Sequence, residues 1–202
     1  MTRTLQMTVP DGWRLVEPGD GIRSVDAAAA DLTESMATGD RALWRSTVAE
    51  AWEGALSSVQ QEHGEVVSLL VPVGGLAAEL PVTVAVLRLA LATSSPHEAN
   101  SMLASVAAQD ATARLLATDA GPAMRTHSRS ALDSSHADRL AVQVEDLPGI
   151  EVLRARYLLP PLGHGRWLAL LHTVVGVNDE TTSAWLELCD ALVIGARWSR
   201  EE

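Results

Sequence analysis

The chain of 202 residues contains one cysteine, no phenylalanine and no lysine, so all 15 of its basic residues are arginine. A single cysteine, Cys189, cannot form an internal disulfide and excludes zinc sites built from several cysteines. Met1 to Pro10 lacks the apolar stretch of a signal peptide, and no segment reaches about 18 apolar residues without charge. These absences predict a cytoplasmic protein with no membrane insertion.

Charge and composition restrict the function further. The formal net charge is -11, which argues against nucleic-acid binding because a phosphate backbone requires a concentrated basic surface. Hydrophobic residues make up 47% of the chain and charged residues 20%, enough for a sizeable core. The length suits one domain over residues 1–202. We therefore expect an acidic, folded, single-domain protein.

The first part of the sequence predicts strands followed by helices. Pro10-Asp11-Gly12 is typical of a tight turn, here between short strands at Thr4 to Val9 and Trp13 to Val16. An alanine-rich run predicts a helix from Ser24 to Met36. A second helix, capped by Asp40, carries apolar residues at helical spacing as far as Val59 and ends at Gly64.

The middle of the sequence alternates strands with a well-capped helix. Glu65 to Val73 and Pro81 to Thr93 are predicted strands, and the second has apolar residues on both faces, as expected of a strand covered on both sides. Ser95 and Glu98 form a capping box around Pro96, which predicts a helix start.

The last part predicts a meander of antiparallel strands and a final helix. The strands alternate at period two and are separated by turn residues; they are Thr112 to Thr118, Ala123 to Ser130, Arg139 to Glu145, Glu151 to Leu159, and Trp167 to Val175. A helix from Asn178 to Trp198 follows, with Asn178 as its cap and Cys189 on its apolar stripe. The fold class is therefore α+β, with an antiparallel sheet of about six or seven strands flanked by helices in an α/β/α sandwich.

Two stretches of sequence resemble the PsbP-like superfamily. Val9-Pro10-Asp11-Gly12-Trp13 is similar to the opening of many bacterial members, and Arg166 to Thr173 with Ala191 to Trp198 is similar to their closing strand and helix. The resemblance implies an α/β/α sandwich around an antiparallel sheet. It also implies a binding or assembly role, since members include a photosystem extrinsic subunit and a nuclear-transport GTPase partner.

Several strings contain catalytic residue types without the spacing that chemistry requires. Asp133-Ser134-Ser135-His136-Ala137-Asp138 holds the residues of a hydrolase triad, but the G-x-S-x-G elbow is absent and a solvated loop is the favoured interpretation. Gly163-His164-Gly165 opens a strand and indicates a hairpin turn. The scattered histidines favour no metal site. We predict no catalytic residues, no metal and no cofactor.

Charge on alternating strand positions is the least ordinary feature of the sequence. Arg125, His127 and Arg129 share one face of a predicted strand, and Arg154 and Arg156 share one face of another. If the strands are neighbours, these residues form a basic stripe that binds a carboxylate, a phosphate or an acidic partner. The alternative is that the arginines pair with acids such as Glu145, Glu151 and Asp119, which we favour.

The sequence favours a non-enzymatic binding or assembly protein of unknown partner, acting on another protein or as a homo-oligomer through an uncovered part of its sheet. One alternative is a small-molecule-binding protein or hydrolase with a site near the strands that bear arginine and histidine. Another is a secretion or toxin-neutralising accessory protein whose acidic surface suits a basic client.

Overall fold

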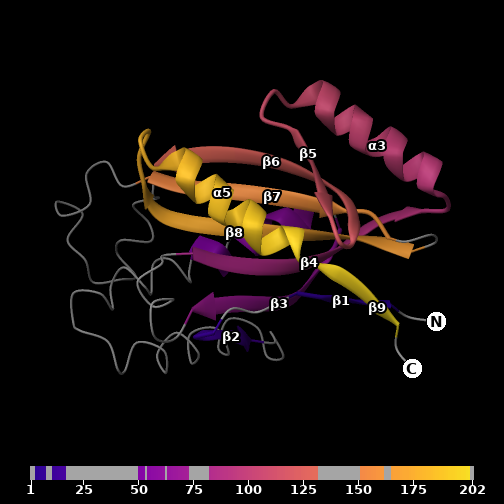
Figure 1. Ribbon diagram of the computed structural model, residues 1–202, viewed down its shortest axis with the longest axis horizontal. Helices are drawn as coiled ribbons and strands as arrows, with labels where there is room; N and C mark the ends of the chain where they lie inside the picture. The colour runs from indigo at the N-terminus through magenta and orange to yellow at the C-terminus, as the bar shows by residue number, and fades with distance from the viewer. Residues whose placement is uncertain are drawn as a thin grey trace.

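The computed structural model describes residues 3–7, 11–16, 50–52, 54–61, 63–72, 82–131, 151–161 and 165–200 (Figure 1). Its elements in chain order are β1 (Arg3–Gln6), β2 (Trp13–Val16), β3 (Glu65–Pro72), β4 (Val82–Thr93), α3 (Pro96–Gln109), β5 (Arg114–Thr118), β6 (Gly121–Ala131), β7 (Glu151–Leu159), β8 (Gly165–Val177), α5 (Thr182–Ile194) and β9 (Arg197–Arg200). Residues 50–52 and 54–61 are also helical. The helix predicted at Ser24 to Met36 and the strand predicted at Arg139 to Glu145 lie outside the described residues.

Seven strands form one antiparallel sheet in the order β2-β3-β4-β8-β7-β6-β5. Four of the five strands predicted for the meander, β5 to β8, pair in sequence order, and β6 pairs directly with β7. β1 and β9 form a separate two-stranded antiparallel sheet. The α+β class and the antiparallel sheet are confirmed.

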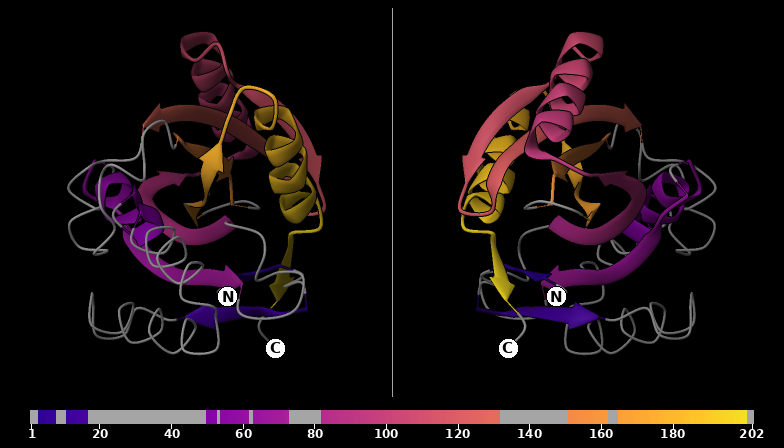
Figure 2. Two further views of the ribbon diagram at one scale, coloured as in Figure 1. Left: turned by 90° about the vertical axis from the view of Figure 1, so that its left-hand side faces the viewer. Right: turned by 90° about the vertical axis from the view of Figure 1, so that its right-hand side faces the viewer.

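Helices cover both faces of the sheet (Figure 2). On one face, which we call the α5 face, Val82 and Val84 of β4 share a core cluster with Cys189 of α5. On the other, the α3 face, Leu87 and Leu89 of β4 join a cluster that includes residues of α3 and of the helical segments 50–52 and 54–61. The two apolar faces of β4 are therefore both buried, as the sequence predicted.

The capping box at the start of α3 is confirmed, except that the Glu98 side chain bonds Ser94 instead of Ser95. The backbone N–H of Glu98 donates to Ser95 Oγ at 3.2 Å. The Glu98 carboxylate accepts from the backbone N–H and the hydroxyl of Ser94, at 2.8 and 2.9 Å. These bonds satisfy donors at the helix N-terminus and lower the pKa of Glu98.

The predictions about the chain ends are only partly confirmed. The two short N-terminal strands form, but they do not pair with each other, because β1 pairs with β9 and β2 pairs with β3. The last helix begins at Thr182 and ends at Ile194, so Trp198 belongs to β9. Its cap is Thr181, whereas Asn178 Oδ1 accepts the backbone N–H of Thr181 at 2.8 Å in the preceding turn. None of the described helices is long and apolar enough to cross a membrane.

Gly64 follows the helical residues 54–61 at a point where two backbones approach closely. A Cβ atom at Gly64 would lie 2.6 Å from the carbonyl oxygen of Arg88 in β4. We expect Gly64→Ala to lower the free energy of unfolding by about 2 kcal/mol, measured by urea denaturation, because the clash is with backbone.

Gly54→Ala is the matched control for this prediction. The Cβ at Gly54 meets only side-chain atoms, the nearest being Arg154 Nε at 3.4 Å. Within a helix, alanine is favoured over glycine by about 1 kcal/mol, so Gly54→Ala should stabilise the protein or leave it unchanged. Equal effects of the two substitutions would contradict the close approach at Gly64.

Candidate functional site

The five candidate binding residues lie on adjacent strands but on opposite faces of the sheet. β6 and β7 pair directly, with Arg125 opposite Tyr157 in the core of the α5 face. His127 and Arg129 follow at alternate positions of the same strand face. Arg154 and Arg156 lie opposite Ser128 and Thr126, on the α3 face. The structure thus brings together three candidates on one face and two on the other, so they do not form one stripe.

Arg125 is buried against α5 and forms an ion pair with Asp190. Its Nη1 donates to Asp190 Oδ2 at 2.6 Å, and the two side chains are 8% and 10% exposed. The hydroxyl of Tyr157 donates to the other carboxylate oxygen, Oδ1, at 2.8 Å. Arg114 reaches Asp190 Oδ2 only at 3.9 Å, from a mostly exposed position on β5.

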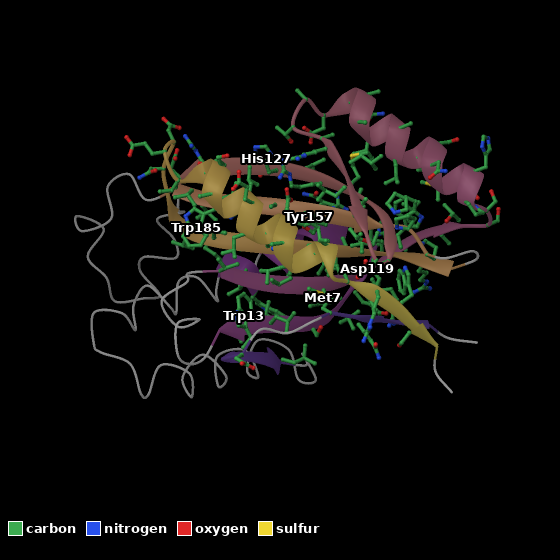
Figure 3. The ribbon with its side chains drawn as sticks, viewed as in Figure 1. Met7, Trp13, Asp119, His127, Tyr157 and Trp185 are labelled. Atoms are coloured by element: carbon green, nitrogen blue, oxygen red, sulfur yellow. The ribbon has the colours of Figure 1, made fainter. Side chains whose placement is uncertain are left out.

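The carboxylate of Asp190 therefore joins strands β6 and β7 to α5. Figure 3 shows Tyr157 beneath α5, with Trp185 toward the N-terminal end of the helix and Asp119 beyond its C-terminal end. Burial, with the charges of Cys189 and Asp190 adding to it, raises the pKa of Tyr157 far above its usual range. The phenol stays protonated and remains a hydrogen-bond donor.

Arg129 binds the beginning of α5. Its Nε contacts Glu151 Oε2 at 2.8 Å, its Nη1 donates to Thr182 Oγ1 at 3.0 Å, and its Nη2 contacts the Asp179 carboxylate. The Asp179 bond raises the pKa of Arg129. The pair with Glu151 is one of the acid pairs that the alternative interpretation of the sequence predicted.

Arg154 makes the corresponding contact on the α3 face. Its Nη2 lies 2.5 Å from Glu50 Oε2, and its Nη1 donates to Ser130 Oγ at 2.9 Å. Glu50 is almost fully buried and is one of the helical residues 50–52. Arg156 is half-buried on the same face. The candidate arginines of β6 and β7 thus attach covering helices to both sides of the sheet.

His127 lies between Arg125 and Arg129 and is half-buried. Its backbone N–H donates to Thr112 Oγ1 at 3.0 Å, and the Thr112 hydroxyl donates to Asp110 Oδ1 at 2.7 Å. Burial, followed by the charge of Arg125, lowers the pKa of His127. The imidazole is therefore held toward its neutral form.

The sequence interpretation missed His172, a fully buried titratable group in this region. His172 is fully buried on β8, and its ring centroid lies 4.9 Å from that of Tyr157. Neither ring nitrogen has a hydrogen-bond partner among the described residues, and burial lowers the pKa to about 3. The sequence does indicate this burial, because His172 lies within the apolar run of the predicted strand Trp167 to Val175.

Cys189 is buried, as predicted, and burial raises its pKa to about 12. The described residues hold no group of three or more His, Cys, Asp or Glu side chains able to bind a metal ion. The Asp133 to Asp138 string and residues 163–164 lie outside the described residues.

β5 is the last strand of the seven-stranded sheet (Figure 1). Ala117 lies opposite Pro122, and Thr118 opposite Gly121 across the turn. Hydrogen-bonded and non-bonded pairs alternate in an antiparallel ladder, and proline has no N–H, so Ala117 and Pro122 form a non-bonded pair. The N–H and C=O groups of Leu115 and Ala117 consequently point away from β6. We call these groups the free edge.

The free edge is bounded on both sides by internal hydrogen bonds. The N–H of Ala113 donates to Asp110 O at 3.0 Å, and that of Asp119 donates to Ile194 O at 3.0 Å. The side chain of Leu115 is 61% exposed, and that of Ile194, at the end of α5, is 47% exposed. Two of the three exposed large hydrophobic residues in the described chain therefore lie at this edge.

Comparisons with known proteins give one distant structural likeness. No family model matches the chain. The search of curated proteins gives no match. Among solved structures, the chain is similar to the crystal structure of LpqN, described as involved in cell envelope biogenesis of Mycobacterium tuberculosis. The TM-score is 0.43 with 9% sequence identity, over 98% of this chain and 85% of that chain. This is a fold-level resemblance only.

Proposed function

We propose that the protein is a non-enzymatic binding or assembly protein that binds an extended protein segment along the free edge of β5. The observation that carries the proposal is the pair of outward peptide groups at Leu115 and Ala117, beside an exposed leucine side chain. An extended segment can add to such an edge as a further strand, with main-chain hydrogen bonds supplying affinity. Exposed edges of this kind are usually shielded.

The PsbP-like resemblance gives the proposal a second support. The superfamily's α/β/α architecture corresponds to an antiparallel sheet with helices on both faces, and its members are mostly binding or assembly proteins. We propose on this basis that the chain is a distant member of the superfamily. We also propose that it acts in the cytoplasm. A shared architecture does not by itself specify a partner.

The alternative functions have less support. A small-molecule or hydrolase site at the candidate strands would need free guanidinium groups, whereas those of Arg125, Arg129 and Arg154 already bind carboxylates of the same chain. A secretion or toxin-neutralising role agrees with the net charge of -11, but no described contact favours it.

Ala117→Pro tests the proposed function. Because the N–H of Ala117 points outward, proline removes an edge donor without removing a bond within the sheet. We expect affinity purification from the native cell to retain partner proteins on the wild-type protein and to lose them on the proline variant.

Ala117→Ser is the matched control, since it keeps the N–H and should retain the same proteins, identified by mass spectrometry. Retention of the same set by all three forms would show that partners bind elsewhere. Recovery of no protein other than the bait itself would count against a binding role for a different protein.

A further inference from the structure

We infer that the segment bound at the free edge is β5 of a second copy of this chain, paired antiparallel about Leu116. This inference rests on the proposed function and names its partner. It follows from which edge groups are free, from the side chains that the pairing brings together, and from the spacing of charge.

The backbone groups allow one two-fold register. Pairing about Leu116 places Leu115 opposite Ala117 of the second copy and Ala117 opposite its Leu115. Each of these pairs exchanges both of its N–H to C=O hydrogen bonds. All the groups of the free edge are then satisfied by identical groups of the partner copy.

The neighbouring registers are excluded because each would need a backbone N–H that is already hydrogen-bonded within the chain. Pairing about Leu115 would place Ala117 opposite Ala113, whose N–H is bonded to Asp110 O. Pairing about Ala117 would place Leu115 opposite Asp119, whose N–H is bonded to Ile194 O. Only the register about Leu116 matches free groups with free groups.

The side chains are self-complementary in that register. The exposed leucine of one copy faces the small side chain of Ala117 in the other, so a large residue packs over a small one. Arg114, which is exposed in the single chain, faces the uncharged Thr118 of the second copy.

The pairing also keeps like charges apart. The two Arg114 positions are separated by four residues along the paired strands, or about 14 Å at the rise of an antiparallel strand. That separation exceeds the screening length of about 8 Å at physiological ionic strength. The result is a closed two-fold dimer in which the two sheets join into one antiparallel sheet.

The first test is the mass in solution, measured by light scattering on purified protein over a dilution series. We expect the wild-type protein and Ala117→Ser to be dimers that dissociate on dilution, and Ala117→Pro to be a monomer. Circular dichroism of the same samples checks that each variant is folded. A wild-type protein that is monomeric at every concentration would overturn the inference.

The second test addresses the register through cysteine pairs. Residues 114 and 118 of opposite copies form a non-bonded pair, whose Cα separation of about 4.5 Å permits a disulfide. A mixture of Arg114→Cys and Thr118→Cys should give a covalent dimer on oxidation, whereas each variant alone should not. The native Cys189 is buried and should not interfere. Equal cross-linking by the single variants would contradict the register.

These results separate the inference from the proposed function. If the wild-type protein is monomeric but Ala117→Pro loses captured partner proteins, the free edge binds another protein and the second-copy inference fails. If Ala117→Pro changes neither the mass nor the captured proteins, both fail. If the wild-type protein is a dimer, Ala117→Pro is a monomer and the cross-link forms only in the mixture, both the inference and the proposed function are supported.

Discussion

Replacing Asp190 by alanine is expected to lower the free energy of unfolding by about 3 to 5 kcal/mol. The substitution leaves the Arg125 guanidinium buried without its carboxylate, and it removes the acceptor for the Tyr157 hydroxyl. A buried charge without a partner keeps its desolvation cost and loses the compensating attraction. Urea denaturation at neutral pH measures the loss.

Two variants show whether the ion pair is the cause. Arg114→Gln removes only an exposed contact at 3.9 Å and should change stability by less than about 1 kcal/mol. The double variant Arg125→Met with Asp190→Leu should lose less than Asp190→Ala alone, because it leaves no buried charge. A double variant as unstable as the sum of its single substitutions would contradict this explanation.

Replacing His172 by leucine is expected to reduce the protein's loss of stability between neutral and acidic pH. The ordinary pKa of 6.5 applies in the unfolded chain, whereas burial lowers it to about 3 in the folded protein. Between these pH values the unfolded chain binds a proton that the folded protein does not, so stability falls as the pH falls. At pH 4 the linked loss is about 3 kcal/mol.

The measurement is the difference in the free energy of unfolding between His172→Leu and the wild type, taken at pH 7 and again at pH 4. Hydrogen bonds lower the pKa values of Asp110 and Glu98, so protonation of these carboxylates in acid destabilises the variant and the wild type alike. Their contributions therefore cancel in the difference. The control His97→Gln changes an exposed histidine and should keep the wild-type pH dependence. Parallel pH profiles for His172→Leu and wild type would contradict a buried neutral imidazole.

Much of the fold could be predicted because local patterns and burial agree. The two apolar faces of β4 required cover on both sides, and the Ser95 capping box fixed the start of α3. The end of α5 was missed because apolar residues continue through Ala196 to Trp198, although Gly195, which caps the helix, is a local signal for its end. The pairing of β1 with β9 joins the two ends of the chain, which periodicity does not reveal.

The candidate site was predicted only as a set of residues. Alternation correctly placed Arg125, His127 and Arg129 on one face, but which helix covers that face depends on tertiary packing. Asp190 was overlooked because it lies beside the apolar stripe of α5, where an acid normally faces solvent. The free edge of β5 depends on strand order and on the position of Pro122, both of which emerge only when the sheet is assembled.

The most direct test of the free edge as the binding surface is amide hydrogen exchange resolved by residue. In dilute solution, the amides of Leu115 and Ala117 should exchange quickly and that of Leu116 slowly, because only the latter is bonded to β6. At high protein concentration, where a second strand is bound, the amides of Leu115 and Ala117 should become protected while that of Leu116 changes little. Equal, concentration-independent exchange at all three positions would contradict the account.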